Sequence, residues 1–347
     1  MSVFIYDGGL GIVKKSGVGK AVLHQRAMLA SVGINTAKNW SEPSGIVHIN
    51  TVFPDSVFAA LRARTMGKKV VYYGHSTEKD FRDSFRGSNY FAPKFKSWIK
   101  FCYNLGDIVL TPSEYSKSLL LEYGVKRPIY SISNGVDTDF FSPSRERGAA
   151  FRARLGISAD EKVVISVGHF MARKGLPDFV ALARSLPSVR FIWFGSTDLR
   201  LVPKNIRDAI TYAPPNLCFF GYISADELRD AYCGADVFAF MSHEETEGIV
   251  VLEALACGTP TVLRDIPVYS GWLENGRNVY KARDVYSFSS AISGLLSGAL
   301  PPLSENGRKT AESRSIRAVG KKLMGIYADA GLLPAAKSAA FTEAAPE

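Results

Sequence analysis

Short hydrophobic runs and longer amphipathic windows alternate along this chain. In the first 142 residues, runs rich in β-branched residues are typical of buried strands, and the windows between them repeat apolar residues at helical spacing. The strand-like runs are 3–6, 46–49, 70–73, 108–110 and 129–132, and the helical windows are 18–32, 55–66, 93–105 and 114–123. This alternation predicts a parallel sheet covered by helices on both faces.

The pattern restarts after a turn-forming segment, Asn134-Gly135-Val136-Asp137, that continues to Pro143. The next strands are expected at 163–167, 189–194, 217–220, 237–240 and 261–263, and the next helices at 176–186, 225–232, 248–256, 285–296 and 313–328. We therefore predict an α/β protein of two doubly wound domains, 1–142 and 143–333, and leave open that the last helix packs back on the first domain. The tail, 334–347, is expected to be disordered.

Composition places the chain among globular proteins, because 46% of its 347 residues are hydrophobic and 22% are charged. No stretch reaches the ~18 apolar residues that a membrane-spanning helix needs, and the first residues lack a signal-peptide pattern. Four cysteines lie far apart without a Cys-x-x-Cys pair, which favours a reducing compartment over a disulfide framework or a zinc site. We expect a cytoplasmic protein.

Basic residues concentrate in the first half of the chain. Residues 1–142 hold 18 Lys and Arg against 11 Asp and Glu, so they carry +7 of the net charge of +9. Such asymmetry indicates an anionic partner, which is nucleic acid, anionic lipid or a phosphorylated ligand. Charge alone is equally compatible with a role in solubility.

Two turns between a strand and a helix suit a phosphate. Gly17 and Gly19, in the segment 14–20, permit a tight turn whose helix N-terminal N–H groups face a phosphate or sugar oxygen. Arg173 and Lys174 stand at a second helix start, where a cation and free N–H groups suit a pyrophosphate. Each turn alone also fits a purely structural role.

The segment 244–260 carries two carboxylates of interest, Glu245 at a loop-to-helix junction and Glu253 a little over two helical turns later. The helix dipole favours an acidic residue at a helix start, so Glu245 also fits a simple cap. Glu253 lies in an apolar run, where an unpaired carboxylate costs several kcal/mol. It therefore needs hydroxyl or N–H partners, either a diol such as ribose or a neighbouring basic side chain.

The pair Asp137 and Asp139 has the Asp-x-Asp spacing of carboxylates that chelate Mg²⁺ or Mn²⁺. The segment lies in the expected linker, where Asp commonly closes a turn or caps a helix. The turn interpretation is favoured, and no metal site is predicted.

Five segments in order resemble one known family. The Glu-x7-Glu pattern of EETEGIVVLEALACGTPTV resembles the signature of the retaining family-4 glycosyltransferases, whose GT-B fold has two Rossmann-like domains facing across a cleft. The segments 107–125, 132–141, 167–175 and 221–238 resemble further family segments. The resemblance covers most of the chain, and it implies that the second domain holds a nucleotide-sugar donor.

The resemblance also implies roles for individual residues. His75 and Glu245 would be catalytic, with His75 near the sugar and Glu245 on hydroxyls of the transferred sugar. Glu253 would bind the ribose and Lys174 the diphosphate. The whole set implied for donor binding is Gly17, Gly19, Arg173, Lys174, Glu245, Gly248, Ile249, Val250 and Glu253.

The family retains the anomeric configuration, and the favoured picture is front-face attack in which a donor phosphate oxygen takes the acceptor proton. Cations and helix N-termini stabilise the developing negative charge, so we expect no metal and no cofactor besides the nucleotide-sugar co-substrate. One position departs from the family pattern. Many members carry Arg where this chain has His169, and Arg173 is the candidate for the missing cation.

The window 90–103 is basic and aromatic, as in a helix that lies on an anionic bilayer. The residues expected to meet the acceptor or the membrane are Lys94, Phe95, Lys96, Trp98 and Lys100. Packing of this helix on the sheet is the alternative. The basic first half also resembles that of bacterial family members that glycosylate diacylglycerol or glycosyl-diacylglycerol.

The prediction is a hexosyltransferase bound peripherally to the inner face of the cell membrane. It moves a hexose from UDP-glucose or UDP-galactose to a lipid such as diacylglycerol or monoglycosyl-diacylglycerol. A cytosolic transferase with a soluble or polysaccharide acceptor shares every donor motif, and an epimerase or phosphorylase on a related fold also stays open. A nucleic-acid-binding protein is a remote alternative without a recognised reading motif, so no nucleic-acid partner is expected.

Overall fold

The computed structural model describes residues 2–13 and 16–333. Lys14 and Lys15 of the first glycine-rich turn, and the expected disordered tail 334–347, lie outside the described residues. The described chain forms two compact units. The first unit holds the residues up to 78, 93–135 and 314–333, and the second holds 79–92 and 136–313.

The first unit is built on a parallel sheet of six strands in the order β2-β1-β3-β4-β5-β6. The strands are β1 (Ser2–Ile5), β2 (Asn35–Ala37), β3 (Ile46–Ile49), β4 (Lys69–Tyr73), β5 (Ile108–Thr111) and β6 (Ile129–Ser131). Five of them match the predicted runs to within one residue at each end. The edge strand β2 was not predicted.

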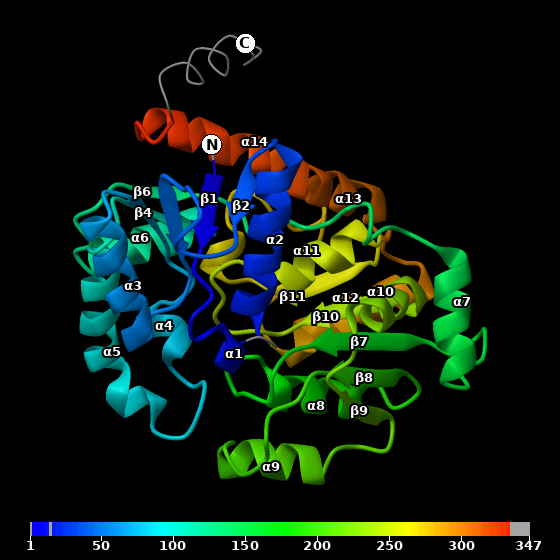
Figure 1. The fold of residues 1–347 in the computed structure, drawn as a ribbon. Helices are drawn as coiled ribbons and strands as arrows, with labels where there is room; N and C mark the ends of the chain where they lie inside the picture. The colour runs from blue at the N-terminus through cyan, green and yellow to red at the C-terminus, as the bar shows by residue number, and fades with distance from the viewer. Residues whose placement is uncertain (1, 14–15, 334–347) are drawn as a thin grey trace. The chain divides into compact units, whose positions relative to one another are not determined.

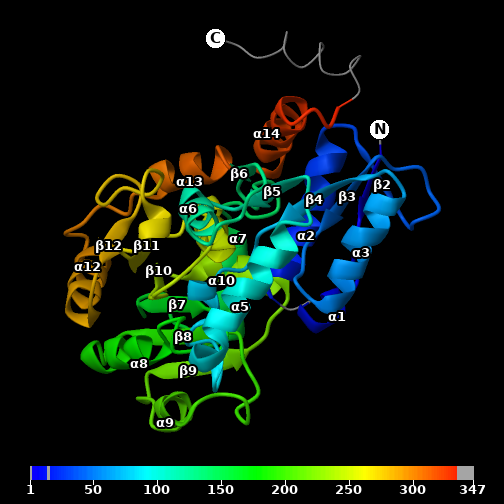
Figure 2. The same cartoon turned by 90° about the vertical axis from the view of Figure 1, so that its left-hand side faces the viewer.

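Helices cover both faces of this sheet, as Figures 1 and 2 show. On one face lie α2 (Gly17–Ser31) and α14 (Ile316–Asp329), which pack together, and on the other lie α3 (Pro54–Thr65), α5 (Ser88–Tyr103) and α6 (Glu114–Glu122). A short helix, α1 (Leu10–Val13), precedes α2. The chain passes to the second unit within α4 (Glu78–Phe81) and returns within α5.

The second unit has its own six-stranded parallel sheet, in the order β12-β11-β10-β7-β8-β9. The strands are β7 (Val163–Val167), β8 (Arg190–Phe194), β9 (Leu217–Gly221), β10 (Val237–Phe240), β11 (Thr261–Arg264) and β12 (Tyr280–Ala282). All except β12 were predicted to within one residue. The prediction of two parallel α/β sheets is confirmed.

Two groups of helices flank the second sheet (Figure 1). One group is α8 (Leu176–Ser185), α9 (Lys204–Thr211) and α12 (Val285–Ser297), and the other is α7 (Arg145–Arg154), α10 (Ala225–Gly234), α11 (Ile249–Ala256) and α13 (Ser304–Glu312). A 3₁₀ turn, η1 (Pro267–Tyr269), follows β11. Near the start of this unit, Asp137 Oδ1 accepts the backbone N–H groups of Asp139 and Phe140 at 3.1 and 2.9 Å, which confirms the turn interpretation of that segment.

In each sheet the strand order reverses at one place, between β1 and β3 in the first unit and between β7 and β10 in the second. Open parallel sheets bind ligands at this switch point, outside the carboxyl ends of the strands. In the second unit the segments concerned are 168–175 after β7 and 241–248 after β10. These are the segments in which the sequence places Arg173, Lys174 and Glu245.

Candidate functional site

The two loops at the switch point of the second unit, 168–175 and 241–248, are joined by hydrogen bonds. The backbone N–H of His243 donates to the carbonyl oxygen of Arg173 at 2.7 Å, and the Ser242 hydroxyl donates to the same oxygen at 3.2 Å. Gly175 ends the first loop with a φ of 73°, and a Cβ there would stand 2.2 Å from the carbonyl oxygen of Met241. Glycine alone permits this approach, so the backbone itself holds the first loop against the second.

Glu245 is buried beside Lys174. The Lys174 ammonium and the Ser242 hydroxyl both donate to Glu245 Oε1, the hydroxyl at 2.6 Å. Burial alone raises the pKa of Glu245, but Lys174 and Arg173 outweigh it and leave that pKa below its usual value. Burial lowers the pKa of Lys174, and the neighbouring Glu245 carboxylate offsets part of this effect. The loops thus hold a buried cation and carboxylate as a pair.

Arg173 is held mainly by a different carboxylate. Its Nη1 lies 2.9 Å from Asp80 Oδ1 and donates to the carbonyl oxygen of Glu244 at 2.9 Å, whereas Glu245 Oε1 is 4.0 Å away. The ring of His169 is engaged elsewhere, because its Nδ1 lies 2.9 Å from the carbonyl oxygen of Ser196. Arg173 therefore adds positive charge beside Glu245, and its role as a substitute for a cation at position 169 stays a prediction.

Helix α11 begins at Ile249, four residues after Glu245. Gly248 precedes it with a φ of 92°, and a Cβ at Gly248 would lie 3.0 Å from the Tyr269 hydroxyl. Ile249 and Val250 form the first turn, where backbone N–H groups have no acceptor one turn earlier in the helix. Such N–H groups, beside a cation, suit an oxygen-rich anion or sugar.

Glu253 is completely buried on α11, one face of which packs on α10. One of its partners is the hydroxyl of Tyr232, which donates to Glu253 Oε2 at 3.4 Å. The expectation of a hydroxyl partner for this carboxylate is confirmed, with the protein itself supplying that hydroxyl. The role of Glu253 toward a ribose stays a prediction.

The first unit holds the two remaining residues predicted for donor binding, and also His75, which was predicted to be catalytic. Gly17 and Gly19 lie in the first turn of α2. His75 follows β4, is 8% exposed, and has its Nε2 3.0 Å from Asn50 Oδ1. Burial lowers the pKa of His75 to about 4, so the ring is neutral at neutral pH. Asn50, directly after β3, was not singled out from the sequence.

Helix α5 packs on the sheet with one side. Ile99 and Cys102 are fully buried in the core beneath it, and Phe95 packs against that core. The Lys96 ammonium lies 4.6 Å from the centre of the Tyr123 ring, which is a cation–π distance. The packing alternative thus holds for this side of the helix.

The other side of α5 contributes to an exposed surface, which we call the basic aromatic surface. Trp98 is anchored there by a hydrogen bond of 2.6 Å from its indole N–H to the carbonyl oxygen of Val52, just before α3. The surface consists of Lys94, Trp98 and Phe101 of α5 and Phe58, Leu61 and Arg62 of α3, all exposed. Lys100 is also exposed but extends from another side of α5, where its ammonium lies beside Gly124. Figure 2 shows these two helices side by side. The contribution of α3 was not predicted.

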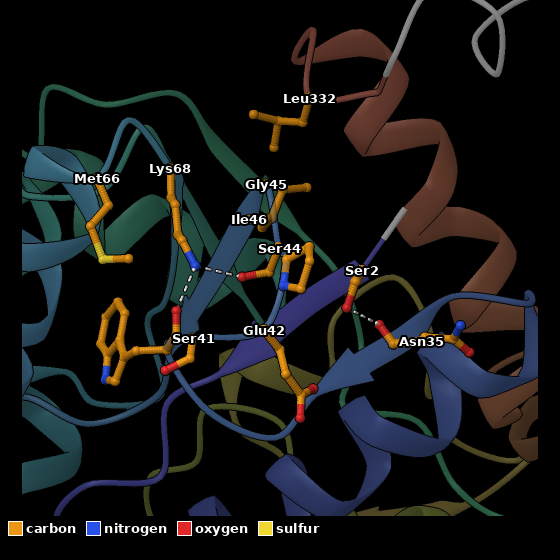
Figure 3. Close-up of a pocket in the computed structure, with 12 residues that line it drawn as sticks. Ser2, Asn35, Ser41, Glu42, Ser44, Gly45, Ile46, Met66, Lys68 and Leu332 are labelled. Carbon is orange, nitrogen blue, oxygen red and sulfur yellow. Dashed lines mark hydrogen bonds between the residues drawn. The ribbon is translucent and has the colours of Figure 1, made fainter.

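The first unit contains a cavity of about 810 Å³ at the amino ends of its sheet strands, opposite the carboxyl ends where such sheets bind ligands (Figure 3). It is lined by residues at or before the amino ends of the strands, including Ser2, Asn35, Ile46 and Lys68. The Lys68 ammonium donates to the Ser44 hydroxyl at 2.9 Å inside it. No predicted site residue lines this cavity, so its size does not make it the candidate site.

Two searches of the described residues gave negative results. None of the described helices combines the length and hydropathy that crossing a bilayer requires. Within 2–13 and 16–333, no group of three or more His, Cys, Asp or Glu side chains is arranged to hold a metal ion. Independence from metal stays a prediction.

Comparison with known proteins gives the family. Residues 34–140 match the family model described as Glycosyltransferase Family 4, and residues 149–314 match the model described as Glycosyl transferases group 1. A processive diacylglycerol alpha-glucosyltransferase of Acholeplasma laidlawii is 38% identical over 330 residues, which are 94% of this chain and 98% of that protein. The chain is a family-4 glycosyltransferase. The prediction of the family and of an enzyme is confirmed.

Other similar proteins agree with this family. An alpha-galactosylglucosyldiacylglycerol synthase of Streptococcus pneumoniae is 25% identical over 69% of this glycosyltransferase and 65% of that protein. HepE of Anabaena, solved with UDP-glucose, has a TM-score of 0.76 at 17% identity, covering 94% of this chain and 99% of that one. Sucrose-phosphate synthase of Thermosynechococcus elongatus has a TM-score of 0.76 at 18% identity, covering 95% and 99%. The predicted GT-B fold is confirmed.

Proposed function

We propose that this glycosyltransferase moves a hexose from UDP-glucose or UDP-galactose to a membrane lipid, either diacylglycerol or monoglycosyl-diacylglycerol, with retention of the anomeric configuration. One observation carries the proposal, namely the 38% identity over nearly the full length of both chains to a processive diacylglycerol alpha-glucosyltransferase. A second similar protein is also named for a glycosyl-diacylglycerol product. The soluble-acceptor and nucleic-acid alternatives have no comparable support.

The second unit is proposed to bind the donor. Lys174 is a buried cation at a switch point, which suits the diphosphate, and Glu245 beside it accepts hydrogen bonds, which suits hydroxyls of the hexose. The first turn of α11, from Gly248 to Val250, adds N–H donors. Glu253 is proposed to bind the ribose from within the same helix.

The chemistry follows from these charges. When the bond between the anomeric carbon and the diphosphate breaks, negative charge grows on the phosphate oxygens. The Lys174 and Arg173 cations and the helix N-terminus stabilise that charge without a metal. A phosphate oxygen of the leaving group takes the acceptor proton as the acceptor oxygen attacks the same face of the sugar.

The first unit is proposed to bind the acceptor and the membrane. It contains most of the excess positive charge of the chain and the basic aromatic surface, in which Lys94 and Arg62 accompany exposed aromatic side chains. Such a surface suits anionic headgroups and the bilayer interface. The proposed location is the cytoplasmic face of the cell membrane.

A product screen tests this function. UDP-glucose and UDP-galactose are each combined with mixed micelles of diacylglycerol or of monoglucosyl-diacylglycerol, and lipid products are separated and identified. We expect hexosyl transfer to at least one lipid, and loss of this product in Glu245→Ala and Glu253→Ala. Glu305→Ala is the matched control, because Glu305 is an exposed carboxylate paired with Lys309 on α13.

Two results would contradict the proposal. Transfer to a soluble saccharide acceptor with none to any lipid would favour the cytosolic alternative. Full turnover in both the Glu245 and the Glu253 variants would show that the site lies elsewhere.

A further inference from the structure

A continuous chain of buried hydrogen bonds in the first unit ends at His75. It begins at Tyr327 on α14, whose hydroxyl is bonded to His48 Nε2 on β3. His48 Nδ1 lies 3.3 Å from Gln25 Oε1 on α2, and Gln25 Nε2 donates to Asn50 Oδ1 at 2.5 Å. His75 Nε2 is 3.0 Å from the same Asn50 oxygen. All five residues are at most 8% exposed.

The partners in this chain determine where the protons lie. Burial lowers the pKa of His48 to about 3, so its ring is neutral and one nitrogen must accept. Gln25 Oε1 is an acceptor, so His48 Nδ1 carries the proton and His48 Nε2 accepts from the Tyr327 hydroxyl. Asn50 Oδ1 also accepts, so the proton of the neutral His75 ring lies on Nε2.

Reversing the direction of donation along this chain would leave more buried polar groups without a hydrogen-bond partner. With both amides turned over, His48 Nε2 would donate to Tyr327, whose own hydroxyl proton would then have no acceptor within the described part of the chain. The buried Asn50 oxygen would move to the position of an N–H that already has no partner. The polarity described above leaves one buried group, the Asn50 side-chain NH2, unsatisfied, whereas the reverse leaves two, so it is the more stable of the two.

We propose that Tyr327, His48, Gln25 and Asn50 are positioning residues that hold His75 in the tautomer with Nε2 protonated, so that Nδ1 accepts a hydrogen bond from a sugar hydroxyl. The identity of this ligand rests on the proposed function, whereas the tautomer does not. His75 Nδ1 makes no hydrogen bond within the residues that the structure describes.

The position of this chain in the fold supports the proposal. Asn50 directly follows β3, which flanks the switch point of the first sheet, and His75 is the second residue after β4, the neighbour of β3. The chain of hydrogen bonds therefore ends where such sheets bind ligands. A buried network with an unsatisfied N–H is a poor device for stability alone, which favours a role in positioning.

The tautomer is measured directly by ¹⁵N NMR on protein labelled with ¹⁵N in its histidine rings. The chain has five histidines, so the spectrum is simple to assign. His75→Gln assigns the signals. In the wild type we expect His75 Nε2 protonated and Nδ1 unprotonated. In Asn50→Leu, which removes the acceptor, we expect signals averaged between the two tautomers. A wild-type His75 ring protonated on Nδ1, or unchanged signals in Asn50→Leu, would overturn the inference.

Steady-state kinetics test whether the His75 tautomer matters for binding the sugar. The variants change residues that lie successively further from His75 along the hydrogen-bond chain. We expect kcat/KM for the nucleotide sugar to fall about tenfold in Asn50→Leu and less in Gln25→Met and Tyr327→Phe, in step with the loss of the single tautomer rather than with any change in Tm. Tyr72→Phe is the control, because Tyr72 is a buried tyrosine whose hydroxyl bonds the carbonyl oxygen of Thr51, outside this chain. Activity that follows Tm instead of the tautomer would overturn the functional role.

These outcomes are separable from those of the proposed function. A wild type that turns over no nucleotide sugar with any lipid contradicts the proposed function and leaves the NMR result standing. An active wild type with the opposite tautomer contradicts only the present inference.

Discussion

The Lys174 ammonium donates a hydrogen bond to the Glu245 carboxylate, and both side chains are largely buried. Lys174 is thus the counter-ion of Glu245. In the proposed donor site, a diphosphate at Lys174 would compete with Glu245 for the same cation and leave Glu245 available to sugar hydroxyls. On that proposal, one hydrogen bond couples the two halves of the nucleotide-sugar site.

This coupling gives a prediction for stability. Lys174→Met leaves the Glu245 carboxylate buried without its main cation, and we expect a loss of about 3–5 kcal/mol in the free energy of unfolding. The double variant Lys174→Met with Glu245→Gln removes both charges and should recover much of this loss. Urea unfolding of the wild type, of Lys174→Met, of Glu245→Gln and of the double variant measures the coupling. Strictly additive losses would contradict a coupled pair.

Gly175 is predicted to be irreplaceable for a steric reason. In Gly175→Ala the new Cβ would meet the Met241 carbonyl oxygen at 2.2 Å, so the two loops of the site must separate. Gly271→Ala is the matched control, because Gly271 has a similar φ of 80° with no atom within 4 Å. We expect the control to lose about 1–2 kcal/mol and Gly175→Ala clearly more. Equal melting temperatures of the two variants would be the contrary result.

Glu253→Gln tests the carboxylate on α11 with little change in packing. The amide oxygen can still accept from the Tyr232 hydroxyl, so we expect a small effect on Tm. Loss of a charged hydrogen-bond acceptor for the ribose should raise the KM for the nucleotide sugar by about 10-fold or more. Tyr232→Phe removes the protein hydroxyl and keeps the carboxylate, so its KM should stay close to that of the wild type. An unchanged KM in Glu253→Gln would remove Glu253 from the donor site.

Acid is predicted to destabilise the first unit through two histidines. Burial lowers the pKa of His48 to about 3 and that of His75 to about 4, against an ordinary value of about 6.5 in the unfolded chain. Between these values only the unfolded chain takes up the proton, so stability falls as the pH drops below about 6.5. Each histidine should account for about 2 kcal/mol between pH 6.5 and pH 5.

Denaturant unfolding at the two pH values measures this effect. His48→Gln should reduce the difference between pH 6.5 and pH 5 by about 2 kcal/mol. An unchanged pH dependence in His48→Gln would contradict the assignment.

The basic aromatic surface is predicted to bind anionic bilayers. Lys94→Gln with Arg62→Gln removes two exposed charges of this surface, each worth about 1 kcal/mol near an anionic membrane, so partitioning should fall roughly 30-fold. The control is Lys321→Gln with Lys322→Gln, two exposed lysines on α14. Flotation with liposomes of increasing anionic lipid content measures binding. Equal binding by both double variants would exclude this surface as the contact.

Two of the strands and two of the helices that the sequence did not predict lack the buried apolar pattern on which such a prediction rests. The edge strands β2 and β12 are three residues long and include no run of buried β-branched residues. Helices α7 and α13 bury only Gly148 and Phe151, and Gly307 and Ala311, so they lack an apolar stripe. Their packing depends on close approach at glycine, because a Cβ at Gly148 would stand 2.5 Å from the Cys233 carbonyl oxygen.

The site residues could be predicted where a charged side chain stands out against its own local sequence. Glu245 and Glu253 stand out because carboxylates border or interrupt an apolar helix, and Lys174 because it stands at a helix start. The partners that fix these groups come from elsewhere in the chain, such as Asp80 for Arg173. No local pattern links residues so far apart, and only the folded chain brings them together.

Helix α14 has a consequence for how the protein is made. Its Val319, Leu323 and Tyr327 complete the core over β1, β3 and β4, although the whole stretch 136–313 of the second unit lies between it and the earlier parts of its own unit. During translation, part of the sheet face that α2 shares with α14 therefore stays uncovered until α14 leaves the ribosome, after residues 136–313 of the second unit have been made. We expect the nascent chain to be most prone to aggregation in this interval.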